Sequence, residues 1–290
     1  MSLLLEILSP DFLLRNALYG GLIIGFVAPL VGVYLVGRRM VFLGVALPQV
    51  STAGVAGAFF WHALFHQHEH HEGDFWLALS GSTVFTLAAI LALAVWENRS
   101  RARAEERTGV LYAFAGALSL LLVASDRIAE IGILGLLKGE IIAISTGELL
   151  VLAAGYAVIV AALWFFKKDL LLVSADRDLA RSFGKKVLAW DLLLYLIIGT
   201  TISLGVLLVG PLVMFGFLIV PPLIAGRLTT GIRHLPLAAS LFGGFTAFTG
   251  FAVAYRLDWP LGPTDVALAC VVLALVAAAQ TVVGWFRRAS

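Results

Sequence analysis

The sequence has few charged residues and a single cysteine, and each shortage excludes a class of protein. Charged residues make up 13% of the 290 residues and hydrophobic residues 61%, whereas a soluble domain has about 25% charged and 45–50% apolar residues. This composition excludes a sizeable water-soluble domain and places the chain in a lipid bilayer. The one cysteine, Cys270, has no partner for an intramolecular disulfide, so a disulfide framework is excluded as well.

Two motifs for nucleotide and peptide hydrolysis are also missing. The chain contains no Gly-x4-Gly-Lys-Ser/Thr loop for the phosphates of ATP and no His-Glu-x-x-His motif for a catalytic zinc ion. We therefore expect a protein that is not an enzyme and has no intrinsic cofactor. Its energy would come from a partner protein or from an ion gradient.

Long apolar segments dominate the sequence, and its mean hydropathy is +0.99. Because a helix needs about 20 apolar residues to cross a bilayer, we predict an all-α integral membrane protein with about eight or nine crossings. Residues 1–290 would form a single polytopic helical bundle. Residues 125–147 are too polar for a lipid-facing crossing, and we expect a partly re-entrant or surface segment there. The expected spans are 13–37, 41–61, 75–95, 109–124, 148–166, 188–210, 212–226, 235–255 and 265–286.

The positions of Lys and Arg predict the orientation of these spans, because cytoplasmic loops retain such residues during insertion. Alternate loops hold most of the 20 Lys and Arg residues, at 38–39, 99–107, 167–186, 227–233 and 287–288. This bias predicts a multi-pass protein of a bacterial-type inner or plasma membrane. The C-terminus would be cytoplasmic and the N-terminus extracytoplasmic.

A histidine-rich loop over residues 62–74 lies on the predicted extracytoplasmic side. Neutral imidazoles suit borderline divalent ions such as zinc. A histidine-rich tract is a compositional signal, and two interpretations stay open, metal capture and a merely solvated polar loop. The histidines of this loop are His62, His66, His68, His70 and His71.

The longest predicted cytoplasmic loop covers residues 167–187 and contains a short helical pattern. Asp176 is a good N-cap, Leu179, Ala180 and Phe183 supply an apolar stripe, and Gly184 ends the pattern. Such a helix either lies on the membrane surface or presents an apolar ridge to a partner protein in the cytoplasm.

Several blocks in this order resemble the permease subunits of metal-ion ABC transporters, in the zinc, manganese and iron uptake branch. The pattern Asp176-x3-Ala180-x3-Gly184 is similar to the coupling segment of that family. Further blocks that resemble the family lie at 37–44, 137–149, 205–210 with 221–228, and 257–264.

The resemblance implies a fold, a substrate class and partners. It implies a helical bundle like that of type II ABC importer permeases, which translocates zinc, manganese or iron with ATP hydrolysed by a separate cytoplasmic ATPase. The ATPase would dock on the coupling segment, through Asp176, Ala180, Arg181 and Gly184. The other implied partners are an extracytoplasmic metal-binding protein and a second copy of the permease, in a homodimer. No nucleic acid is expected to bind.

The second predicted span departs from the family. There, Gly44 is followed by Asp-Ala-Leu-Ser-His, whose Asp and His line the ion path, whereas this chain has Val45 and Gln49 at those two positions. Valine cannot coordinate an ion, and an amide oxygen is a weak neutral ligand. The polar residues left to line the path are Gln49, Ser51 and Thr52, although the two hydroxyls could equally bond to the backbone one turn earlier.

Two other classes of protein remain as alternatives. An ion-gradient-driven secondary transporter normally carries ionisable residues in the middle of the membrane, and none lies securely inside a predicted span. A membrane scaffold that transports nothing is the third possibility. The sequence does not identify the metal.

Overall fold

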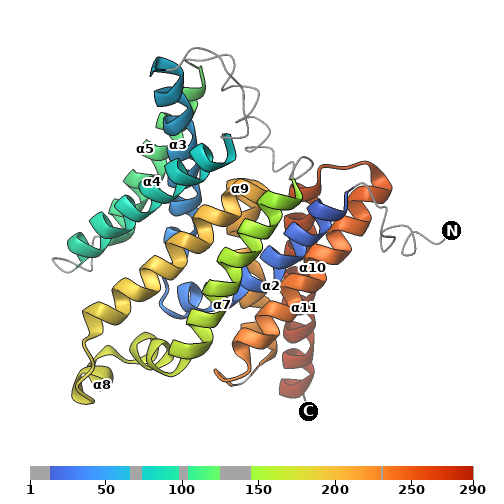
Figure 1. The fold of residues 1–290 in the computed structure, drawn as a ribbon. Coiled ribbons are helices and arrows are strands. Elements are labelled where there is room, and N and C mark those ends of the chain that lie inside the picture. The colour runs from blue at the N-terminus through green and yellow to red at the C-terminus, as the bar shows by residue number, and fades with distance from the viewer. Residues whose placement is uncertain (1–13, 66–73, 98–103, 125–144, 230, 290) are drawn as a thin grey trace.

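In the computed structural model, every described secondary-structure element is a helix. The described residues are 14–65, 74–97, 104–124, 145–229 and 231–289. Figure 1 shows the helices packed side by side in a bundle. The helices are α2 (Arg15–Gly37), α3 (Val41–Phe65), α4 (Asp74–Glu97), α5 (Ala104–Ala124), α7 (Thr146–Ala175), α8 (Arg177–Ser182), α9 (Val187–Leu228), α10 (Leu235–Leu257) and α11 (Leu261–Ala289).

Within these described ranges, eight helices are long and apolar enough to cross a membrane. This confirms the predicted polytopic helical bundle. One of the eight, α9, has 42 residues, and a straight helix of that length would measure about 63 Å, twice the thickness of a bilayer core.

The length of α9 is explained by a break at Gly210. Its φ of 75° and ψ of 171° are not helical, and only glycine adopts such a conformation readily. Met214 lies so close to Gly205 that a Cβ on the glycine would overlap the methionine sulfur. In a straight helix these residues would be about 13 Å apart along the axis. The chain therefore turns back at Gly210, and the two arms of α9 correspond to the predicted spans 188–210 and 212–226.

The predicted span 148–166 corresponds to α7 but is too short. Helix α7 begins at Thr146, because Ser145 and Glu148 form a reciprocal capping box there. It then continues to Ala175. The helix also continues past Lys167 and Lys168, so the first nine residues of the predicted loop 167–187 belong to α7. The preceding segment 125–144 lies outside the described residues.

The first arm of α9 and the neighbouring helices form the core. Buried side chains of α9 pack against α2, α3, α4 and α7. Small residues permit the closest approaches, since a Cβ on Gly32 of α2 would overlap the backbone oxygen of Leu218 in α9. Gly54 of α3 and Gly81 of α4 meet backbone to backbone in the same way. Such contacts are typical of helix pairs in membranes.

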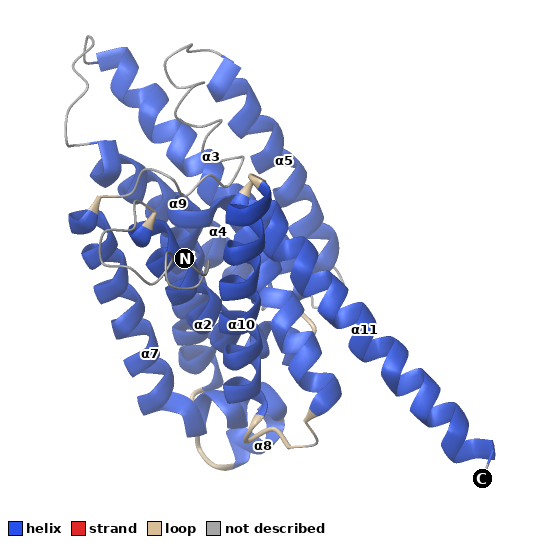
Figure 2. Cartoon of the chain, turned by 90° about the vertical axis from the view of Figure 1, so that its right-hand side faces the viewer, coloured by secondary structure: helices blue, strands red, loops and turns tan. Residues whose placement is uncertain are grey.

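The last helix and the short helix α8 lie at the periphery. Figure 2 shows the C-terminal part of α11 projecting away from the bundle, while α8 lies at the end of the bundle where α7 finishes and α9 begins. We call this the α8 end. The predicted sidedness of the two termini stays a prediction.

Candidate translocation path and coupling site

Gln49 lies in α3 at the contact with α5. Val45 and Gln49 are both half-buried and one turn apart on the same face of the helix. The Gln49 amide nitrogen donates to Ser119 Oγ of α5 at 3.4 Å, and its side chain packs beside Gly116. A role for Gln49 in the path stays a prediction, and the structure places it where α3 and α5 meet.

Ser51, in contrast, is fully buried in a chain of hydroxyl groups. Its Oγ is 2.6 Å from Ser82 Oγ of α4, and Ser82 Oγ is in turn 2.7 Å from Ser203 Oγ of α9. Thr83 Oγ1 adds a further contact to Ser203 at 2.9 Å. These contacts join three helices inside the bundle. In this conformation Ser51 therefore holds helices together.

Thr52 is also buried, and its hydroxyl donates to the backbone oxygen of Pro48 at 3.0 Å. This is the backbone bond one turn earlier that was one of the two interpretations of the hydroxyls. The structure thus brings Ser51 into a helix contact and turns Thr52 back on its own helix. Gln49 is the half-buried member of the three predicted path residues.

The predicted metal-capture histidines fall largely outside the described residues. His66, His68, His70 and His71 lie outside the described residues, while His62 is half-buried near the end of α3. Within the part of the chain that the structure describes, no group of three or more His, Cys, Asp or Glu side chains is arranged to hold a metal ion. Metal capture by this loop stays a prediction.

Helix α8 has the cap that the sequence predicts. Asp176 Oδ1 accepts hydrogen bonds from the backbone N–H groups of Asp178 and Leu179, both at 2.9 Å. The helix is short, with six residues, and the chain leaves it through Gly184, whose φ of 73° lies in the left-handed region.

The apolar residues of α8 divide between two directions. Ala180 is fully buried and packs with Val173 of α7 and Val187 of α9. Leu179 and Phe183 are 46% and 67% exposed, so they are the residues of the predicted stripe that are available to a partner. Arg181 pairs with Asp178 on the exposed side at 2.8 Å.

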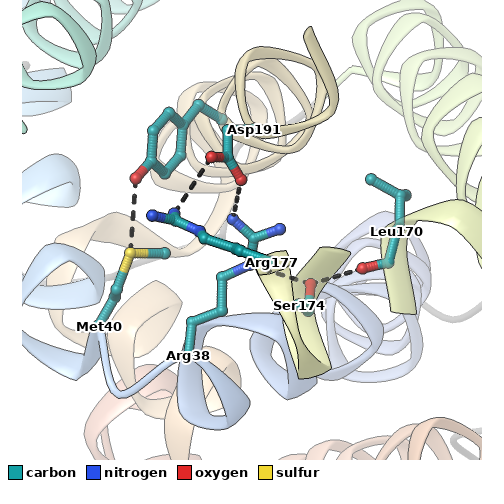
Figure 3. A network of polar contacts seen from close by, with 7 residues as sticks. Arg38, Met40, Leu170, Ser174, Arg177 and Asp191 are labelled. Atoms are coloured by element: carbon teal, nitrogen blue, oxygen red, sulfur yellow. Dashed lines mark hydrogen bonds and ion pairs between the residues drawn. The ribbon is translucent and has the colours of Figure 1, made fainter. Parts of the chain in front are cut away.

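A buried carboxylate, Asp191, lies next to α8 in the second turn of α9. Figure 3 shows two guanidinium groups approaching it from different elements. Arg38 Nη1, at the end of α2, is 2.6 Å from Asp191 Oδ1, and Arg177 Nη2, at the start of α8, is 3.2 Å from Asp191 Oδ2. Arg38 Nε also donates to Ser174 Oγ of α7 at 2.9 Å. Three elements therefore meet at the Asp191 carboxylate, and α7 joins them through the contact of Ser174 with Arg38.

This network includes a functional candidate that the sequence analysis missed. Asp191 is one acidic residue near the start of the predicted span 188–210, and a buried carboxylate needs a partner. The available signal was the basic residues of the loops 38–39 and 167–186, which the sequence predicts on the same side of the membrane and which could supply that partner.

A cavity of about 600 Å³ is lined by residues from the start of α8 and from the turn that joins α2 to α3. Arg38, Arg39 and Met40 form this α2–α3 turn and line one part of the cavity, while Asp176 and Arg177 line another. Tyr195 of α9 also lines it, and the Tyr195 hydroxyl is 3.6 Å from Met40 Sδ. Residues of both segments that Asp191 connects therefore line one cavity.

A second buried acidic residue, Asp265, lies in α11. Its side chain faces Gly250 of α10, and its Oδ1 has no hydrogen-bond partner among the described residues. Asp265 and Asp191 each lie within the first two turns of their helices. The two buried carboxylates are therefore near helix ends, whereas a carrier driven by an ion gradient normally has ionisable groups at mid-membrane.

Comparison with known proteins gives consistent matches over nearly the whole chain. Residues 11–280 match the family described as "ABC 3 transport family". A Thermotoga maritima protein described as "Probable metal transport system membrane protein" is 28% identical, covering 89% of this chain and 86% of its own length. The "Manganese transport system membrane protein MntC" of Listeria monocytogenes is 22% identical, covering 93% and 91%.

A solved structure shows the same fold. The structure titled "PsaBC from Streptococcus pneumoniae in complex with Fab" superposes with a TM-score of 0.78 at 23% identity, covering 92% of this chain and 91% of that chain. At this identity the likeness establishes the arrangement of helices.

Proposed function

Because the chain belongs to the ABC 3 transport family, we propose that it is the permease subunit of an importer that moves a divalent transition-metal ion with ATP hydrolysed by a separate subunit. The observation that carries this proposal is α8. It is capped by Asp176, held to the bundle by Ala180, and has Leu179 and Phe183 exposed on its outer side. A rigid helix with exposed apolar side chains suits docking to a folded protein.

The proposed substrate is manganese, iron or zinc. The Listeria relative is named for manganese transport, which favours Mn²⁺ as the first ion to test. A second permease copy and an extracytoplasmic metal-binding protein complete the proposed importer, with the α8 end on the cytoplasmic side.

Co-expression with a cytoplasmic ABC ATPase of the source organism would test the proposal. The complex is purified, reconstituted into liposomes with the metal-binding protein, and assayed for uptake of radioactive Mn²⁺ with and without ATP. We expect the two subunits to co-purify and uptake to require ATP. Uptake that needs no ATP but follows an imposed proton or sodium gradient would refute the proposal.

The docking surface has its own variant and control. Phe183→Asp places a charge on the exposed apolar side chain of α8, and we expect the ATPase to be lost on purification. Trp164→Asp is unsuitable as a control, because Trp164 is an apolar residue in the membrane-spanning part of α7. Lys168→Asp, on an exposed residue at the end of that span, is the matched control and should retain the ATPase. Equal retention by both variants would place docking elsewhere.

A further inference from the structure

Three segments of the chain converge on the carboxylate of Asp191. Its Oδ1 pairs with Arg38 at 2.6 Å and its Oδ2 with Arg177 at 3.2 Å, so each oxygen has its own guanidinium. Arg177 is the first residue of α8, and Arg38 is the C-cap of α2. One rigid acidic group therefore connects α8 to the beginning of the α2–α3 turn.

This connection matters for movement, because residues of both segments line the cavity described above. Other contacts of the α8 region lead to its immediate neighbours: Ala180 packs on α7 and α9, and Lys185 pairs with Asp169 of α7 at 2.8 Å. The bridge through Asp191 reaches Arg38 at the α2–α3 turn, which Ser174 near the end of α7 also contacts at 2.9 Å. The cavity that both segments line gives them room to move relative to one another.

The two ion pairs differ in how firmly they are held. The side chains of Arg38 and Asp191 are 5% and 12% exposed, while that of Arg177 is 22% exposed. A buried pair in a low-dielectric surrounding is costly to separate, whereas a pair that water reaches is weaker. We therefore expect Arg38 and Asp191 to move together, and the contact of Arg177 to form or break with movements of α8.

The α2–α3 turn passes such a movement directly into α3. Arg39 has a φ of 59°, an unusual value for a side chain with a Cβ, and the turn is closed by a hydrogen bond from Met40 N to Leu35 O at 2.9 Å. Helix α3 begins at the next residue and carries Val45 and Gln49. We therefore expect a shift of the tightly closed turn to move the face of α3 that contacts α5.

From this geometry we propose that Asp191 is a positioning residue that couples movement of α8 to α3 through the bridge from Arg177 to Arg38. The proposal rests on the proposed function, in which α8 receives the ATPase. The bridge transmits the movement; it does not bind the ATPase or the metal.

Arg177→Ala is the informative variant, because it removes the link to α8 and leaves the buried pair of Arg38 and Asp191 in place. The complex is reconstituted with the ATPase and the metal-binding protein, and both ATP hydrolysis and uptake of radioactive Mn²⁺ are measured. We expect the ATPase to remain bound and active while the number of ions imported per ATP falls about tenfold, a typical coupling effect. Arg177→Lys should restore most of the ratio, since it keeps a cation within reach of Asp191.

Lys168→Ala is the matched control, because it removes one exposed positive charge from the end of α7 without touching Asp191. It should have the wild-type ratio of ions per ATP. A merely structural role for Arg177 would lower the yield of the complex and leave that ratio unchanged.

The possible results separate this inference from the proposed function. If the wild-type permease binds the ATPase and imports Mn²⁺ but Arg177→Ala has the same ratio, the inference is wrong and the proposed function stands. Loss of ATPase binding in Arg177→Ala would also overturn it, because Arg177 would then belong to the docking surface. If the wild-type permease never binds the ATPase, the proposed function fails first.

Discussion

Neutralising Asp191 should destabilise the protein far more than removing Arg177, its partly exposed partner. The side chain of Arg38 is 5% exposed and relies on Asp191 at 2.6 Å, while Arg38 Nη2 already has no hydrogen-bond partner among the described residues. Asp191→Asn would leave a buried cation without its counter-charge. Removing one member of a buried ion pair costs about 3–5 kcal/mol, and we expect a loss in that range.

Two further variants test whether burial is the cause. Arg177→Ala removes the partner whose side chain is 22% exposed, and a partly exposed pair contributes about 1 kcal/mol or less. The double variant Arg38→Met with Asp191→Leu removes both buried charges together. It should recover most of the loss, because apolar replacements of a buried pair are often neutral in stability. Ser174 retains a partner in this variant, since its hydroxyl donates to Leu170 O at 2.6 Å.

Unfolding in mixed micelles with increasing dodecyl sulfate would measure these differences, with fluorescence of the seven tryptophans as the signal. The expected order of stability is wild type, then Arg177→Ala, then Asp191→Asn, with the double variant close to wild type. Equal losses for Arg177→Ala and Asp191→Asn would refute the reasoning. So would a double variant that is less stable than Asp191→Asn.

Three other predictions follow from particular contacts. Gly210→Ala should cost about 1–3 kcal/mol in the same unfolding assay, because its φ of 75° and ψ of 171° strain any side chain; unchanged stability would contradict a sharp turn there. Ser82→Ala should cost about 1 kcal/mol through the lost bonds to Ser51 and Ser203, with the more exposed Thr83→Ala as a milder control, and the reverse order would count against the buried hydroxyl chain. Val45→Asp with Gln49→His should create a Zn²⁺ or Mn²⁺ site detectable by equilibrium dialysis, while the buried carboxylate costs about 2.5–3.5 kcal/mol without metal; no gain in binding would show that the two positions do not face a common space.

The features predicted correctly from the sequence depend on residues close together in the chain. Apolar length alone gives the spans, because each crossing must satisfy its own backbone. The cap of α8 is equally local, since Asp176 bonds to groups two and three residues later. The break in α9 was predictable for the same reason, because Gly210 and Pro211 interrupt an otherwise continuous apolar run.

The features that the sequence did not reveal depend on distant residues or on helix length beyond the bilayer. Arg38 and Asp191 are separated by 153 positions, so no local pattern pairs them. Ser51 meets Ser82 and Ser203 across three helices, and a pattern within α3 cannot distinguish this contact from a lining position. Helix α7 extends past Lys167 because a charged residue at the membrane surface is compatible with continued helix, so the charge marked the edge of the bilayer and not the end of the helix.

The distribution of polar groups has a consequence for ion passage. The charges of the described network lie at the α8 end, whereas the polar groups where α3 meets α5 and where α4 meets α9 are the neutral side chains Gln49, Ser82 and Ser203. Conduction requires binding that is strong enough for entry and weak enough for release, and neutral oxygens bind a divalent ion less tightly than carboxylates do. If the face of Gln49 lines the path, we expect the ion to keep part of its hydration shell or a chelating molecule as it passes. Under the proposed function, we then expect release to need little protein movement at mid-membrane, and the ATPase to act mainly by opening and closing the α8 end.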